Sequence, residues 1–118
     1  MKLANLVISE GLTIKVCDFG LAAECQTNFQ RRFTYCGPIQ YQSPEMIRGE
    51  GYTYDSIDKW QMGVLMHTLL FGHVPWELQK DERDTLFNIR TKELDIPLKA
   101  KLSNDARALL YGLLAKEP

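Results

Sequence analysis

The sequence of 118 residues predicts an α+β fold that is mainly helical, with one small β ribbon followed by helices. Two short runs rich in β-branched residues, 5–8 and 13–16, open the chain, and helical periodicity dominates from residue 55 onward. The contents of 45% hydrophobic and 25% charged residues are ordinary for a globular protein, and the length fits one domain or part of one.

The two β runs are predicted to pair as a ribbon, with a turn at residues 9–11 between them. A ribbon of two strands is not stable by itself, so we expect it to lie on a larger body. The stretch from Asp18 to Pro44 shows no regular pattern. A loop of this length inside a compact domain is usually functional or disordered.

Residues 55–71 carry the strongest helical pattern, with apolar residues on most sides of the predicted helix. We therefore expect this helix to be buried. Gly72 is predicted to end it, and Pro75 follows three residues later.

Two further helices are predicted. The first spans residues 80–93, is more charged, and is expected to turn Leu86, Phe87 and Ile89 inward. The second begins after Ser103, a good N-cap, and its predicted apolar stripe consists of Ala106, Leu109, Leu110, Leu113 and Leu114.

Charge and cysteine content limit the partners. Fourteen basic and fifteen acidic residues give no electrostatic case for nucleic acid or for a membrane surface, so neither is expected as a partner. Cys17, Cys25 and Cys36 form no CxxC pair, which is typical of thiols in a reducing compartment. No signal peptide follows Met1, and the apolar run 64–71 is too short to cross a bilayer. An intracellular, cytoplasmic setting is expected.

The most informative motif is Asp18-Phe19-Gly20, with Asn5 thirteen residues before Asp18 and Ser43-Pro44-Glu45 after it. A carboxylate and a carboxamide are hard oxygen ligands, which suit Mg²⁺ on a nucleotide triphosphate. With the surrounding string Lys-Val-Cys-Asp-Phe-Gly-Leu-Ala at 15–22, the chain resembles the protein kinases. The resemblance covers residues 1–118 as a partial kinase domain: part of the C-terminal lobe, from the middle of the catalytic loop onward, without the N-terminal lobe.

The resemblance implies ATP and Mg²⁺ as cofactors and assigns roles to five residues. Asp18 and Asn5 would hold the metal, and Lys2 would neutralise the γ-phosphate, as in kinases that act on Ser or Thr. Phe19 would pack inward and orient Asp18, and Gly20 would let the backbone turn. Taken singly, each has a plainer interpretation, as a turn Asp, a capping Asn or a solvated Lys.

Thr34 resembles the threonine of an activation loop that an upstream kinase phosphorylates, although it also fits an ordinary exposed loop residue. Its usual partner, the Arg of a His-Arg-Asp motif, is not in this sequence. Glu45 and Asp58 match scaffold positions: the first would pair with an Arg beyond residue 118, and the second would accept hydrogen bonds from catalytic-loop amides.

One departure from the family bears on activity. Pro38 stands where kinases carry a Thr that contacts the catalytic base, so both a hydroxyl and an N–H are missing there. Two interpretations follow. The chain is part of a Ser/Thr protein kinase that transfers the γ-phosphoryl group to protein hydroxyls and is inactive alone. Alternatively, it is a pseudokinase or truncated regulatory module that binds proteins without catalysis. The motif spacing most resembles polo-like kinases, with calcium/calmodulin-dependent kinases close behind.

Overall fold

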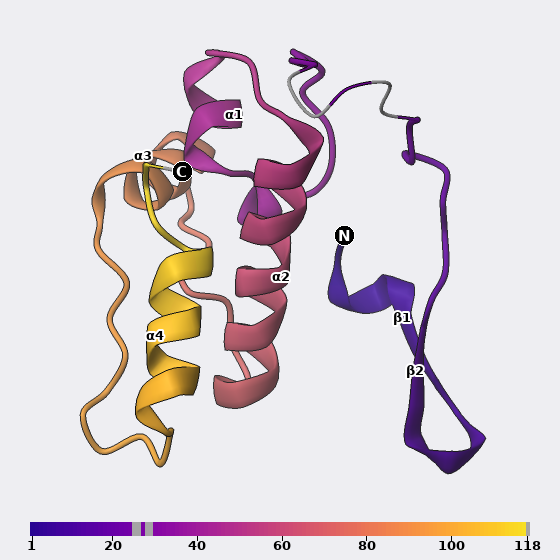
Figure 1. Cartoon of the computed structure of the whole chain (residues 1–118). Coiled ribbons are helices and arrows are strands. Elements are labelled where there is room, and N and C mark those ends of the chain that lie inside the picture. Colours follow the sequence, from indigo (N-terminus) through magenta and orange to yellow (C-terminus); the bar gives the residue numbers. More distant parts are fainter. Residues whose placement is uncertain (25–26, 28–29, 118) are drawn as a thin grey trace.

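The computed structural model describes residues 1–24, 27 and 30–117 of the chain, so Cys25 lies outside the described residues. It confirms an α+β fold that is mainly helical. The ribbon lies on the opposite side of α2 from α4 (Figure 1). In chain order the elements are η1 (Leu3–Asn5), β1 (Leu6–Ser9), η2 (Glu10–Leu12), β2 (Thr13–Val16), η3 (Ile39–Tyr41), α1 (Pro44–Arg48), α2 (Tyr54–Phe71), α3 (Glu82–Thr91) and α4 (Asn104–Leu113).

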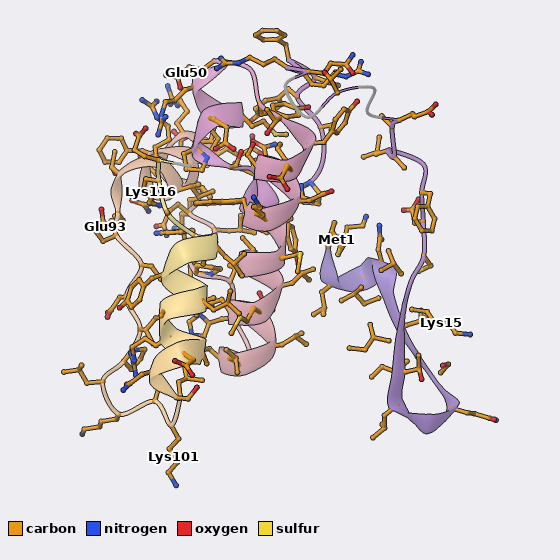
Figure 2. The ribbon with its side chains drawn as sticks, in the orientation of Figure 1. Met1, Lys15, Glu50, Glu93, Lys101 and Lys116 are labelled. Atoms are coloured by element: carbon orange, nitrogen blue, oxygen red, sulfur yellow. The ribbon has the colours of Figure 1, made fainter. Side chains whose placement is uncertain are left out.

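The β ribbon forms where the sequence predicts it. β1 and β2 are antiparallel, with Leu6 opposite Val16 and Ile8 opposite Ile14. Because directly opposed residues share a face, these four aliphatic side chains lie on one side of the ribbon. Leu6 packs against the helical core, whereas Ile8 is 70% exposed. Lys15 extends outward from the same ribbon (Figure 2).

Helix α2 is the centre of the helical body. The Thr53 side chain accepts a hydrogen bond from the Ser56 amide at 3.2 Å, and Gly72, with φ of 80°, ends the helix as predicted. Trp60 and Val64 are buried, but Met62 is 51% exposed. The prediction of burial on most sides is therefore wrong, because α4 and its neighbours cover only part of the helix surface.

Helix α3 is shorter than predicted, from Glu82 to Thr91, because Asp81 caps it by accepting a hydrogen bond from the Arg83 amide at 2.9 Å. Its buried residues are Thr85 and Ile89, each 1% exposed. Phe87 is 60% exposed, so its predicted inward position is wrong. Two residues before Ile89, it lies about 200° around the helix from that buried side chain.

Helix α4 begins after Ser103, whose side chain accepts from the Ala106 amide at 3.1 Å, which confirms the predicted cap. Leu110 is 0% exposed and Leu114 3%, as the predicted stripe requires. Leu109 is 54% exposed, which corrects its place in that stripe. The stripe is narrower than predicted because this helix packs mainly against α2.

The short helix α1 was not predicted. The Ser43 side chain accepts from the Met46 amide at 3.4 Å, Pro44 occupies the first turn, and Gly49 ends the helix with φ of 71°. A Ser cap followed by Pro is a helix-start signal, so the sequence does carry the information.

Two stacked tryptophans form the centre of the core. The rings of Trp60 and Trp76 lie 5.4 Å apart and nearly parallel, and the Trp76 indole N–H donates to the Lys92 carbonyl at 3.0 Å. The Lys116 ammonium lies 3.5 Å from the centroid of the Trp76 ring and donates to the Ile89 carbonyl. This cation–π contact holds the segment after α4 against the core. None of the described helices is long and apolar enough to cross a membrane.

A buried histidine makes stability depend on pH. His67 of α2 is 2% exposed, its Nδ1 lies 2.9 Å from the His73 carbonyl, and burial lowers the pKa of His67 below its usual 6.5. Well above pH 6.5 the ring is neutral in both the folded and the unfolded chain. Below it the unfolded chain takes up the proton first, so the free energy of unfolding falls until the pH reaches the folded pKa.

Urea unfolding at about pH 7.5 and about pH 5.5 measures this effect. We expect a larger loss of stability on acidification in the unmodified chain and in His73→Gln than in His67→Gln. Equal losses in all three proteins would show that His67 does not contribute.

Candidate active site

The base of the ribbon brings Asn5 and Asp18 close together. Asn5 ends η1 just before β1, and Cys17 follows β2. The Cys17 amide donates to the Asn5 carbonyl at 2.8 Å, and the Cys17 thiol donates to the same oxygen at 3.2 Å. Since Asp18 is the next residue, the antiparallel register carries its carboxylate to the same end of the ribbon as the Asn5 carboxamide.

Asp18 has an unusual backbone conformation, with φ of 64°, in the left-handed region that non-glycine residues rarely adopt. Its Oδ1 accepts a hydrogen bond from the Gly20 amide at 3.2 Å. A Cβ on Gly20 would lie only 3.2 Å from that oxygen. Strain of this kind persists where the surroundings hold it, and it is concentrated at functional sites. No hydrogen bond or ion pair with a described residue engages the Oδ2 of Asp18, which is free to bind a ligand.

These residues line one cavity of about 540 Å³. The ribbon end contributes Asn5 and Asp18, the segment before it contributes Lys2, and α2 contributes Asp58. Further lining residues come from the segment after the ribbon, from η3 and from the first half of α2; they include Cys36, Gly37, Pro38, Tyr41, Tyr52, Tyr54, Ile57 and Gln61. The cavity thus combines the hard oxygen donors of Asn5, Asp18 and Asp58 and the cation of Lys2 with apolar walls, which suits a ligand that carries phosphate and a metal.

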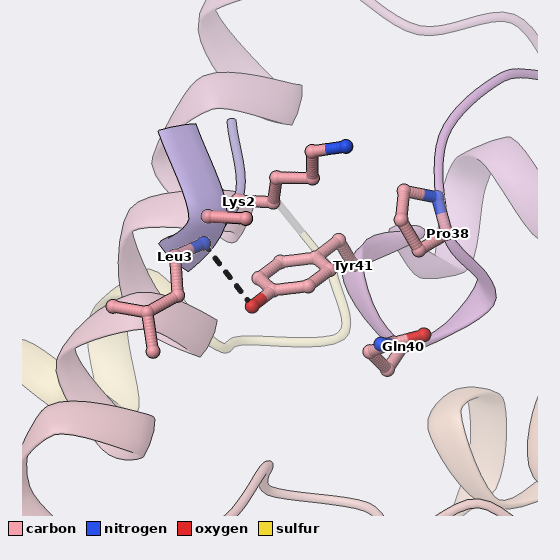
Figure 3. Close-up of a pocket in the computed structure, with 6 residues that line it drawn as sticks. Lys2, Leu3, Pro38, Gln40 and Tyr41 are labelled. Carbon is pink, nitrogen blue, oxygen red and sulfur yellow. Dashed lines mark hydrogen bonds between the residues drawn. The ribbon is translucent and has the colours of Figure 1, made fainter. Parts of the chain in front are cut away.

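The segment that carries Lys2 is held in place by η3. The Leu3 amide donates to the Tyr41 hydroxyl at 3.3 Å, and Lys2, Pro38 and Gln40 lie around the same tyrosine (Figure 3). Tyr41 is 8% exposed and belongs to the core. Lys2 therefore enters the cavity from a segment tied to the helical body.

Residues 1–118 match the protein kinase domain family along the whole chain. The chain belongs to the protein kinase family. It is 36% identical over all 118 residues to a probable serine/threonine-protein kinase, CCRP1, of Zea mays, and 36% identical over the same length to human ribosomal protein S6 kinase alpha-2. It spans 19% and 16% of the length of those two relatives. The first relative is named as a probable serine/threonine-protein kinase and the second as a kinase of ribosomal protein S6. Membership of the polo-like group stays a prediction.

Phe19 of this kinase chain does not pack inward. It is 70% exposed, although it lines the cavity beside Asp18. The predicted inward position is therefore wrong for this structure, in which most of the ring is accessible to solvent.

Thr34 is exposed, as a modified residue must be, and its backbone is well anchored. Its carbonyl accepts a hydrogen bond from the Tyr52 hydroxyl at 2.5 Å. Tyr52 in turn pairs with Arg32 through both backbone hydrogen bonds, at 2.8 and 2.9 Å. Burial raises the pKa of Tyr52, so the hydroxyl keeps the proton that it donates.

The two scaffold carboxylates differ in their surroundings. Glu45 is 9% exposed on α1, and its carboxylate has no ion pair or hydrogen bond with a described residue. Asp58 is exposed at the cavity wall and accepts no hydrogen bond from the amides of residues 1–5. The scaffold roles of both residues therefore stay predictions, as do the ligand roles of Lys2, Asn5 and Asp18.

Sequence reasoning missed the two tyrosines that position the site. Tyr41 bonds to Leu3 and Tyr52 bonds to Thr34, across separations of 38 and 18 residues. No local pattern identifies such partners, because they are set by tertiary packing. The available signal is their aromatic character, with Tyr52 directly after Gly51 and Tyr41 four residues after Gly37.

Proposed function

We propose that this chain is part of an ATP-dependent Ser/Thr protein kinase, which transfers the γ-phosphoryl group of ATP to hydroxyl groups of protein substrates. The observation that carries the proposal is the single cavity lined by Lys2, Asn5 and Asp18. Phosphoryl transfer depends on positioning and on charge stabilisation, and those three side chains are of the types that provide both.

The donor set fits Mg²⁺. The Asn5 carboxamide makes no hydrogen bond with a described residue, and the Oδ2 of Asp18 is free as well. Mg²⁺ keeps several waters and uses one or two protein ligands together with substrate phosphates, so two protein oxygens are enough. No group of three His, Cys, Asp or Glu residues that could hold a metal exists among the described residues, which agrees with such an open site.

Each side chain has a separate task in this proposal. Asp18 and Asn5 hold the metal that bridges the nucleotide phosphates, and Mg²⁺ offsets the negative charge of the transferring group when it is bound. Lys2 places a positive charge beside the terminal phosphate. The strained backbone at Asp18 keeps its carboxylate aimed without reorganisation when the nucleotide arrives.

The test is Mg²⁺-dependent binding of ATP to the intact protein, measured by calorimetry. We expect Asp18→Ala to weaken binding at least about tenfold, since a charge-assisted contact is lost. Asp55→Ala is the matched control, because Asp55 is exposed on α2 and, within the described part of the chain, its carboxylate pairs with Lys59 alone. Unchanged Mg²⁺-dependent affinity in Asp18→Ala would contradict the proposal.

Pro38 favours a second candidate, a pseudokinase that binds proteins without catalysis. Its ring lines the cavity close to Lys2 and brings neither a hydroxyl nor an N–H (Figure 3). One experiment on the intact protein, which measures both ATP binding and phosphotransfer, distinguishes the two candidate functions. ATP binding without phosphotransfer, with transfer gained in Pro38→Thr, supports the pseudokinase. Transfer by the unmodified protein supports the enzyme.

We further propose that Thr34 is phosphorylated by an upstream kinase and that this phosphate regulates the cavity. The exposure of Thr34 supports the proposal, as does its anchor on Tyr52, which lines the cavity.

A further inference from the structure

Two histidines meet at the C-terminal end of helix α2. Asp58 and Gln61, in the first half of α2, line the cavity, whereas His67 lies in the last two turns and His73 in the loop that follows. The ring centroids of the two histidines are 5.3 Å apart, and the ring planes meet at 74°. The proposed kinase mechanism uses neither residue.

Backbone carbonyls fix the tautomer of both rings. Nδ1 of His67 lies 2.9 Å from the His73 carbonyl oxygen, and Nδ1 of His73 lies 3.0 Å from the Val74 carbonyl oxygen. A carbonyl oxygen can only accept, so each Nδ1 carries a proton and donates it. In the neutral ring, Nε2 is then the nitrogen with a free lone pair. Histidines that bind metals are commonly held in this way, with one nitrogen donating to a carbonyl and the other bound to the metal.

Both Nε2 atoms are open to a ligand, since neither forms a hydrogen bond with a described residue. The His73 side chain is exposed. His67 is only 2% exposed, but its Nε2 is not among the buried atoms that lack a partner in the described part of the chain. The small exposed area of His67 therefore includes this nitrogen, and an ion from solvent can reach both lone pairs.

The spacing of the rings fits a transition-metal ion. Imidazole nitrogen suits Zn²⁺, and the bond between them is about 2.0–2.1 Å long. Two imidazoles on one tetrahedral Zn²⁺ consequently have ring centroids about 5 Å apart. The distance of 5.3 Å between His67 and His73 is close to this value. Helix α2 ends at Phe71, beside the pair, and the negative end of its dipole favours a cation there.

We propose that His67 and His73 bind one Zn²⁺ through their Nε2 atoms. No group of three His, Cys, Asp or Glu side chains that could hold a metal exists in the described ranges, so water or a small exogenous ligand takes the other positions of the ion. The unfolded chain does not hold the two rings at this spacing. Zinc therefore binds the folded chain preferentially and holds the loop 72–75, which leads to Trp76 of the core, against α2.

The test follows the imidazole nitrogens of the full chain by ¹⁵N NMR while ZnCl₂ is added. Because the chain has two histidines, the spectrum reports on this pair alone. We expect the Nε2 signals of both rings to shift together and to saturate at one equivalent of zinc, while both Nδ1 atoms stay protonated. Urea unfolding with and without zinc is measured in parallel, and zinc should raise the midpoint. Neither measurement depends on the folding of a variant.

Variants then identify the ligands. His73→Gln replaces an exposed ring and should lower the affinity for zinc at least about tenfold, with an equal or larger loss in His67→Gln. Cys17→Ser/Cys36→Ser is the control, because it removes two free thiols that also attract zinc, and it should leave the shifts of the imidazole signals unchanged. Mg²⁺, a hard ion that prefers oxygen ligands, should shift neither ring.

An edge-to-face contact between two rings is the plainer explanation of the geometry, and it predicts none of these results. Unmoved Nε2 signals, a shift confined to one ring, or equal affinity for zinc in the unmodified chain and in His73→Gln would overturn the proposal. The measurements contain no ATP, so a negative result here is distinct from a failure of the proposed kinase activity.

Discussion

Leu110→Ala is expected to lower the free energy of unfolding by about 2–5 kcal/mol. Leu110 is 0% exposed on α4 and belongs to the core cluster that includes Val64 and Leu65 of α2. Truncation removes one methine and two methyl carbons and leaves a hole that close-packed neighbours fill only in part. Urea unfolding followed by circular dichroism measures the change, and a two-state transition is needed for the comparison.

Leu109→Ala is the matched control, with the same substitution one residue earlier. Leu109 is 54% exposed, so its truncation removes little buried area, and alanine is the better helix former. We expect a change within about 0.5 kcal/mol. Equal losses for the two variants would show that α4 turns a different face to α2 than the structure describes.

The ends of the helices were predictable because their signals are local. Ser103 caps α4, Gly72 ends α2 in a left-handed conformation, and the two strands lie within one residue of the predicted runs. Each of these features depends on the chemistry of one or two residues and on backbone geometry. The same reasoning would have found α1 from Ser43 and Pro44, had those residues been examined as a helix start.

The choice of helix face was less predictable, because it depends on which neighbours the helix meets. Phe87 and Leu109 fit an apolar stripe in the sequence, yet both are more than half exposed. A stripe of five apolar positions is wider than one neighbouring helix can cover, so sequence alone does not say which edge stays outside. Packing of α4 on α2 decides that Leu110 and Leu114 are inside.

In the candidate site, too, some features could be predicted from the sequence and others could not. The resemblance to kinases implied that Asn5 and Asp18 hold one metal together. The structure places both at one cavity, because the hairpin of two short strands brings its ends together. The anchors Tyr41 and Tyr52 could not be predicted, since their partners are distant in sequence. Phe19 was assigned an inward position by family resemblance alone, and that position depends on packing partners that residues 15–22 do not specify.

Gly63→Ala is expected to destabilise the chain by about 1–3 kcal/mol, although alanine favours helix. Gly63 lies in the middle of α2, where that helix meets the end of α4. A Cβ there would lie 2.8 Å from both Cδ2 and Cγ of Leu114 and 2.9 Å from the Cβ of Leu113. Carbon atoms that are not bonded pack at about 3.5–4.0 Å, so α4 would have to move away from α2.

The control substitution lies in α4, and the substitution expected to relieve the clash lies at the C-terminal end of that helix. Gly112 is also helical, but a Cβ there would meet nothing within 4 Å, so Gly112→Ala is expected to stabilise by about 0.5–1 kcal/mol. Leu114→Ala removes the side chain that the new methyl group would strike. In the double variant Gly63→Ala/Leu114→Ala, the loss should therefore be smaller than the sum of the single losses, with a coupling of about 1 kcal/mol or more. Strictly additive losses would mean that the close approach of α2 and α4 at Gly63 does not limit the size of the residue there.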